Sequence, residues 1–423
     1  MASIEAVTSE TDLRGLDKQV LAWLSPDDRD PASVSQREAQ QLAWYTAPQQ
    51  WVMPVDELSE VAAACARLLE TSGRPRAAAA LLEHTPAVLA GWARSPRAGF
   101  AAYLRTMPAT GVQPPDTPTL AWAQVMGIDE ARVLDAAERM LEAALDAGAF
   151  TPGRRGWRSI QRNLVDAWLR APSPLFAGQA PVDVVHAERT VYWAEAGTST
   201  RRTILHPVLP LLAMPTDRAT DTVAPVHFLL DAISQGIRLT DTGQLPPAFV
   251  RDAAARFGWG LPAFTIRKEG DVVEVGEVRD LATRAGLITV RKRQLVLTAA
   301  GWAALGDPAR LWSTATAGWF DHDEFATHVA EVAAVLLLAE PGTSMHLTAA
   351  AHEAVAPSFQ NLEGAQPDRR DVRLALWDWL RPGHALGWLR YQDSRTERIH
   401  ELTDPGRAAA IEGLRHRSRA PRR

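Results

Sequence analysis

The sequence predicts a mainly α-helical protein, in which a helical N-terminal domain is followed by α+β modules that end in two-stranded β-hairpins. Apolar residues recur at three- and four-residue spacing along most of the 423 residues, which is typical of amphipathic helices. Pro114, Pro115 and Pro118 interrupt this pattern and predict an extended connector. In the C-terminal half, alternating segments twice flank a polar tip, and this pattern predicts a hairpin.

Residues 1–112 make up the predicted helical domain. We expect helices over 13–24, 55–69, 76–83, 86–92 and 96–105, with Gly73 and Pro75 ending the second of them. The single cysteine, Cys65, lies on the apolar stripe of that helix. We therefore interpret it as a core residue rather than a reactive thiol.

Composition excludes several kinds of chemistry. Only Lys18, Lys268 and Lys292 among the 45 basic residues are lysines, and none lies in a P-loop, kinase or Schiff-base context. One cysteine cannot form an internal disulfide or a multi-thiolate zinc site. The sequence contains neither a Gly-x-Ser-x-Gly elbow nor a Gly-x-Gly-x-x-Gly fingerprint. We therefore expect no catalytic residues and no cofactor, although a pocket of converging polar groups would escape detection by sequence.

A helix-turn-helix is predicted beyond the connector. Residues 119–126 suggest a short helix, Gly127 a turn, and Asp129 the cap of a long helix that Gly148 terminates. This stretch resembles the helix-turn-helix of bacterial winged-helix regulators, in which a Leu-Ala-x-x-(Met/Leu)-Gly segment leads into the recognition helix. The resemblance implies a wing at 150–157.

The hairpins support two further modules. Residues 287–290 are expected to pair with 295–298 around a turn at 291–294, and Thr298 caps the next helix. Residues 387–391 and 400–410 repeat the hairpin and its Thr-x-x-Gly ending. This arrangement resembles the end of the winged-helix fold of the multiple-antibiotic-resistance-regulator type. The expected order is winged-helix-like modules at 117–180, 236–310 and 311–412, a connector at 181–235, and a frayed basic tail at 413–423.

The resemblance implies which residues would meet DNA, because the second helix of the motif enters the major groove and the wing touches the backbone. The predicted DNA-binding residues are Arg279, Arg284, Arg291, Lys292 and Arg293 in the second module, and Arg369, Arg370, Arg373, Arg390, Arg395 and Arg398 in the third. The first module differs. Its long helix is expected to expose six carboxylates, which would repel a duplex and favour a protein partner: Asp129, Glu130, Asp135, Glu138, Glu142 and Asp146.

Charge is segregated along the chain, although the net charge is only −5. Residues 1–150 are acidic, 236–310 and 365–423 carry a basic excess, and 311–364 contain seven acidic residues and no lysine or arginine. We interpret the chain as a non-enzymatic, nucleic-acid-associated protein, such as a regulator or chromosome-associated factor. The alternative is an adaptor that uses winged helices to contact protein, with a homodimer formed through the long helix of the first module.

Two remaining features have structural explanations. Glu324 and His328 share a helix face near Asp321 and His322, but an aspartate there also suits a helix cap, and we expect no metal. Most of the 15 tryptophans occupy apolar helix positions, which predicts core packing rather than base stacking. The apolar runs are too short to span a bilayer, and we expect a cytoplasmic protein without membrane contact.

Overall fold

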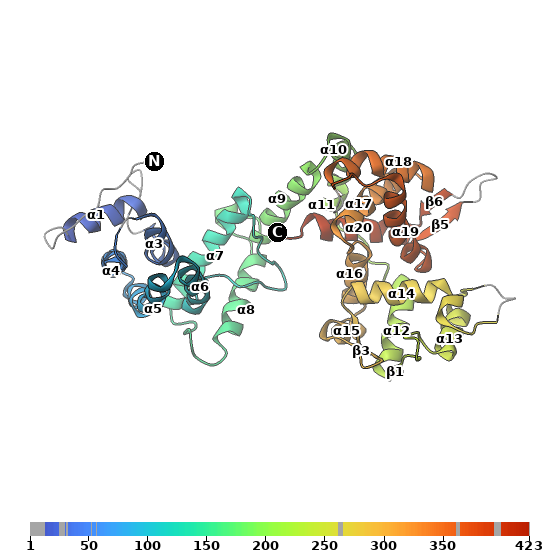
Figure 1. The fold of residues 1–423 in the computed structure, drawn as a ribbon, viewed down its shortest axis with the longest axis horizontal. Helices are drawn as coiled ribbons and strands as arrows, with labels where there is room; N and C mark the ends of the chain where they lie inside the picture. Colours follow the sequence, from blue (N-terminus) through green and yellow to red (C-terminus); the bar gives the residue numbers. More distant parts are fainter. Residues whose placement is uncertain are drawn as a thin grey trace. The chain divides into compact units, whose positions relative to one another are not determined.

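The computed structural model describes residues 13–24, 30, 33–51, 53–55, 57–260, 265–360, 364–392 and 399–422. The chain forms two compact units, Met1–Glu188 with Pro421–Arg423 and Arg189–Ala420. Helices dominate both units, and the strands of the described residues form two small sheets within the second (Figure 1). The predicted fold class, mainly α with short β-hairpins, is confirmed.

Unit 1 is helical and contains two hydrophobic clusters, one within residues 16–107 and one within 112–185. The change of cluster coincides with the predicted proline-rich connector. Pro86 lies inside α5, so the two helices expected at 76–83 and 86–92 form one. The helices of unit 1 are α1 (Leu13–Leu24), α2 (Gln36–Gln41), α3 (Ala47–Gln50), α4 (Leu58–Thr71), α5 (Pro75–Arg94), α6 (Pro96–Thr106), α7 (Ile128–Asp146), α8 (Trp157–Arg170) and the larger part of α9 (Pro181–Glu195), with a π-helical turn at Leu42–Thr46.

The helix-turn-helix predicted at 119–150 is wrong. Residues 119–127 are not helical, and 150–157 form turns rather than a wing. The predicted cap residue, Asp129, lies inside α7, and its backbone N–H donates to Glu188 Oε1 (3.0 Å) while that of Glu130 donates to Oε2 (2.9 Å). The Glu188 carboxylate therefore satisfies two of the N-terminal amides of α7, which have no partner within the helix.

The prediction that α7 exposes six carboxylates is also wrong for three of them. Glu130, Glu138 and Glu142 are buried. Arg37 pairs with Glu138, and Arg74 Nη1 lies 3.1 Å from Glu142 Oε2. The apolar stripe of α7 packs into the second cluster of unit 1.

Unit 2 contains two modules with the same order of elements (Figure 1). Each has a helix, a short strand, two helices and a hairpin, and each sheet places the third strand between the other two. Module 1 consists of α12 (Ala224–Ser234), β1 (Ile237–Arg238), α13 (Pro247–Phe257), α14 (Val273–Arg284), β2 (Ile288–Arg291) and β3 (Gln294–Leu297). Module 2 consists of α17 (Glu324–Ala339), β4 (Gly342–Thr343), α18 (Ser344–Val355), α19 (Arg369–Ala385), β5 (Leu389–Gln392) and β6 (Ile399–Leu402).

The hairpins form in the predicted register. Ile288 pairs with Leu297 and Arg291 with Gln294, so only Lys292 and Arg293 remain in the turn of module 1. Both have positive φ, 45° and 65°, as the tight turns favoured by hairpin twist require. The predicted two-stranded wings are three-stranded sheets, because the two-residue strands β1 and β4 add to β3 and β6.

The remaining helices complete unit 2, and α16 lies in the core between the two modules. The expected connector, 181–235, is helical over most of its length, and α20 continues to Ser418, so the frayed tail predicted from 413 is wrong over these residues. Its Arg415 Nε donates to the carbonyl of Leu212 at 3.0 Å, which anchors this end of the helix. The helices not yet named are α10 (Ser199–Leu205), α11 (Leu209–Ala213), α15 (Ala299–Leu305), α16 (Pro308–Trp319) and α20 (Asp404–Ser418).

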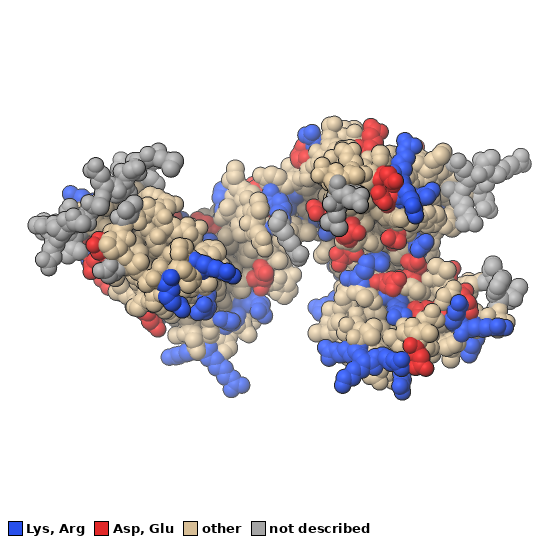
Figure 2. Space-filling view, in the orientation of Figure 1, with Lys and Arg blue, Asp and Glu red and all other residues tan. Residues whose placement is uncertain are grey.

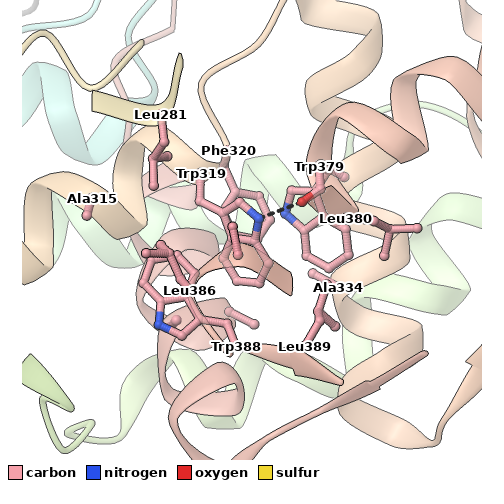
Figure 3. Close-up of a cluster of buried hydrophobic side chains, with 14 of the residues drawn as sticks. Leu281, Ala315, Trp319, Phe320, Ala334, Trp379, Leu380, Leu386, Trp388 and Leu389 are labelled. Atoms are coloured by element: carbon pink, nitrogen blue, oxygen red, sulfur yellow. Dashed lines mark hydrogen bonds between the residues drawn. The ribbon is translucent and has the colours of Figure 1, made fainter. Parts of the chain in front are cut away.

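One hydrophobic cluster joins the two modules (Figure 3). The Trp319 ring stacks on Trp379 with 4.6 Å between ring centroids, and its Nε1 donates to the Trp379 carbonyl at 2.7 Å. Trp388 lies against the same ring at 4.8 Å. The prediction that tryptophans serve the core is confirmed for these residues, whereas Trp302 is 57% exposed.

Candidate nucleic-acid interface

The hairpin of module 1 presents a row of basic side chains. Arg238 on β1 is the register partner of Gln294, which is also the partner of Arg291 on β2. Directly opposite residues of antiparallel strands project from the same face, so the two arginines flank Gln294 across the sheet. Lys292 and Arg293 occupy the exposed turn beside them. Figure 2 shows basic side chains gathered where β1 and β3 lie in Figure 1.

Within the part of the chain that the structure describes, this row forms one ion pair, and it is weak because both partners are exposed. Arg293 Nη1 lies 2.9 Å from Asp241 Oδ1, and the two side chains are 56% and 94% exposed. Exposed pairs contribute about 0–1 kcal/mol because water screens them. A phosphate group can therefore replace Asp241 at little cost.

The predicted residues of the candidate recognition helix, α14, do not project freely from it. Arg279 Nη1 lies 3.2 and 2.9 Å from the two carboxylate oxygens of Glu269, and Glu269 also accepts from the Leu245 N–H at 2.7 Å. Arg284 is half-buried, and burial lowers the pKa of its guanidinium. We therefore remove Arg279 and Arg284 from the interface, because neither projects freely from the helix.

The two candidate recognition helices also pack against each other. α14 contacts α19, and Arg381 Nη1 on α19 lies 4.0 Å from Glu277 Oε1 on α14. Part of each helix surface is thus covered within unit 2. Insertion of both helices into major grooves along these faces is incompatible with the fold.

The predicted residues of module 2 lie in different places. Arg369, Arg370 and Arg373 are exposed in the first turns of α19, whose N-terminus Asp368 caps. Arg390 Nε donates to Glu401 Oε2 across the hairpin at 2.8 Å, and this bond lowers the pKa of Glu401. Arg395 and Arg398 lie outside the described residues.

Sequence reasoning missed Arg238. A two-residue strand gives almost no periodic signal, and its pairing with β3 joins residues far apart in the chain. The available signal was the alternation of apolar Ile237, polar Arg238 and apolar Leu239. That alternation becomes informative only when the neighbouring hairpin is known.

The cluster at 321–328 acts as a helix start. Asp323 Oδ1 accepts from the Ala326 N–H at 2.9 Å and so caps α17. His328 Nε2 lies 4.0 Å from Glu331 Oε2, and burial lowers the pKa of this imidazole. Across the described ranges, no group of three or more His, Cys, Asp or Glu side chains is arranged to hold a metal ion, and no helix is long and apolar enough to cross a membrane.

Comparison of the chain with protein-family models, with curated proteins and with solved structures finds no match.

Proposed function

We propose that this chain is a non-enzymatic, nucleic-acid-associated protein whose module 1 binds the sugar–phosphate backbone through its hairpin. The observation that carries the proposal is the exposed row formed by Arg238, Arg291, Lys292 and Arg293. Strands lie about 4.8 Å apart, so Arg238 and Arg291 start about 10 Å apart on one face of the sheet. Two guanidiniums at that separation can each bind a phosphate in bidentate fashion.

The binding we propose depends on phosphates rather than on base edges. Arg279 is paired with Glu269, Arg284 is half-buried, and the exposed surface of α14 includes Asp280. Base recognition needs free donors on an inserted helix or strand. We therefore expect little sequence preference and a steep dependence on salt.

The test is a fluorescence-anisotropy titration with random-sequence duplex DNA at about 50 and about 200 mM salt, the range in which phosphate-driven affinity falls steeply. The variant Arg291→Ala/Lys292→Ala/Arg293→Ala should bind more weakly. It should also reduce the slope of log affinity against log salt by about 2 to 3, because each lost phosphate contact removes roughly 0.9.

The matched control is Arg94→Ala/Arg97→Ala/Arg105→Ala, which removes the same charge from exposed positions of unit 1. This control should leave the slope close to that of the unmodified protein. An unchanged slope in the hairpin variant, or an equal change in the control, would contradict the assignment.

The second candidate function is a protein-interaction adaptor, and module 2 favours it. Residues 311–364 contain no lysine or arginine, and Figure 2 shows acidic side chains over this part of unit 2. An acidic surface repels nucleic acid and attracts basic protein. The two functions are compatible when module 1 binds nucleic acid and module 2 binds a protein partner.

A further inference from the structure

Module 2 contains an open groove beside its third helix. The groove has a volume of about 440 Å³ and lies between the start of α17, the segment after α18, and α19. Phe325, Phe359 and Leu374 supply its apolar surface, with the two phenylalanine rings packed edge to face at 5.4 Å. Leu374 on α19 is 55% exposed, so its side chain is open to a ligand in the groove.

Module 1 packs aromatic side chains between α12, α13 and the segment that follows α13. Phe228 stacks on Phe249 with ring centroids 5.3 Å apart, and Phe257 lies 4.9 Å from Trp259. Only about 10 Å³ remains between α12, α13 and α14. At this cluster the helices of module 1 therefore leave almost no open space.

The third helices of the two modules can be aligned through equivalent hydrogen bonds at their ends. The Leu287 N–H donates to the carbonyl of Ala282 at 2.9 Å, and the Trp388 N–H donates to that of Gly383 at 2.8 Å. Counting back from these equivalent bonds places Val273 of module 1 at the position of Leu374 in module 2. Val273 is 60% exposed, so it provides a matched control position.

Carboxylates surround the open groove. Asp323, Asp371 and Asp378 line it and are exposed, and none of the lining residues is basic. Such a rim disfavours phosphate groups and favours lysine or arginine. The apolar surface, in turn, favours an inserted aliphatic or aromatic side chain, as in the pockets that hold interface anchors.

We propose that this groove binds a segment of a partner protein in which an apolar anchor residue is flanked by arginine or lysine. The anchor packs against Phe325, Phe359 and Leu374, and the basic flanks pair with Asp323, Asp371 and Asp378. The proposal is independent of nucleic-acid binding by module 1, because the two surfaces share no residue. It assigns the adaptor role to one site and one kind of ligand.

The experiment selects peptides from a phage-displayed library of random peptides about 12 residues long on the full chain. The enriched peptides should share one large apolar residue with at least two neighbouring basic residues. One such peptide, labelled with fluorescein, is then titrated by anisotropy. Leu374→Lys should weaken peptide binding at least about tenfold. The lysine places a charge on the surface that contacts the anchor, and it repels the basic residues beside the anchor.

Two further variants complete the design. Ala375→Phe should block the groove from its floor and weaken binding without a change of charge, whereas Val273→Lys should bind the peptide like the unmodified protein. Duplex DNA should bind equally well to Leu374→Lys and Val273→Lys. The test of peptide binding by the groove is therefore separate from the test of DNA binding by the hairpin.

Three results would overturn the proposal. The first is a selection that yields no enriched peptide or peptides without basic residues. The second is an enriched peptide that binds Leu374→Lys as tightly as the unmodified protein. The third is self-association of the chain, measured by light scattering, that Leu374→Lys abolishes, since the occupant would then be a second copy.

Discussion

Glu331 is a fully buried carboxylate at the centre of a charged network in unit 2. Its Oε2 accepts from Arg201 Nη2 at 2.6 Å, and its Oε1 from Arg417 Nε at 3.4 Å. Burial opposes ionisation, but His328 and the two guanidiniums outweigh it and hold the pKa of Glu331 below its ordinary value. The network thereby ties α10, α17 and α20 together.

The first prediction follows from removing this charge. Glu331→Gln should destabilise unit 2 by about 3–5 kcal/mol, because it leaves the buried Arg201 without its counter-charge. The lowered pKa has a second consequence. The stabilisation from ionised Glu331 is present above about pH 4.5 and is lost as the pH falls through its folded-state value.

Differential scanning calorimetry at neutral pH measures the first effect, with Glu324→Gln on the exposed face of the same helix as control. The control should change stability by less than about 0.5 kcal/mol. Equal stability of Glu331→Gln and the unmodified protein would show that the network contributes no net stabilisation.

Glu142 on α7 gives a prediction of opposite sign. Burial raises its pKa from 4.5 to about 7, and Arg74 only partly offsets this effect. The folded protein therefore holds a proton that the unfolded chain releases between these values, and stability falls as the pH rises from about 4.5 to 7. The free energy of unfolding should therefore differ between pH 5 and pH 8, and Glu142→Gln should reduce this difference by about 1–3 kcal/mol.

Calorimetry of the full chain at pH 5 and pH 8, in which the unfolding of unit 1 is followed, tests this expectation. The control is Asp146→Asn, an exposed acidic position on the same helix. It should retain the pH dependence of the unmodified protein. A pH dependence that survives in Glu142→Gln would assign the proton to another group.

At the scale of elements, the same device closes both hairpins. Thr298 Oγ1 accepts from the Gly301 N–H at 3.0 Å, and Thr403 Oγ1 accepts from the Gly406 N–H at 3.1 Å. Each threonine hydroxyl also donates to the glycine carbonyl that precedes the hairpin, Gly286 or Gly387. The cap therefore fixes the next helix onto the start of the hairpin.

The glycines in this device explain its Thr-x-x-Gly pattern. A Cβ on Gly301 would lie 2.1 Å from the Leu287 carbonyl oxygen, and one on Gly406 would lie 1.7 Å from that of Trp388. Gly301→Ala and Gly406→Ala should each cost about 1–3 kcal/mol, because backbone must move to make room.

Gly276, inside α14, is the control for these two changes because a Cβ there meets nothing within 4 Å. Gly276→Ala should raise stability by about 0.5–1 kcal/mol through better helix propensity. Thermal unfolding of the three variants decides the question. If Gly301→Ala and Gly406→Ala behave like Gly276→Ala, the close contacts do not constrain the sequence.

These elements also show what sequence can and cannot predict. The hairpins and their caps are local, so alternation and a Thr-x-x-Gly signature were sufficient to predict them, and the exposed turn of Lys292 and Arg293 came with them. The helix expected at 119–126 does not form, and Glu188, distant in the chain, accepts from the first amides of α7. Arg279 was predicted to bind DNA, but it pairs with Glu269 instead. That pair depends on how the chain packs and could not be predicted from the sequence.

At the scale of the whole chain, each unit has its own packing, and unit 2 is a pair of modules that share a core. α14 packs on α19, which holds the same position in module 2, so like surfaces meet as they do in a symmetric dimer. Leu281 of α14 and Trp379 of α19 belong to one cluster with Trp319 (Figure 3). A shared core predicts that the two modules unfold together.

Trp319→Ala tests this cooperativity. Loss of a buried tryptophan that contacts Trp379 and Trp388 should cost about 3–5 kcal/mol, because the cavity cannot fully close. Hydrogen exchange read by mass spectrometry should speed up in peptides from α14 and from α19 alike, because both helices lose the same packing partner. Trp302→Ala, at an exposed position of α15, should leave both rates unchanged. Faster exchange confined to one of the two helices would mean that the modules unfold separately, and that the groove of module 2 and the hairpin of module 1 lie on independent folding units.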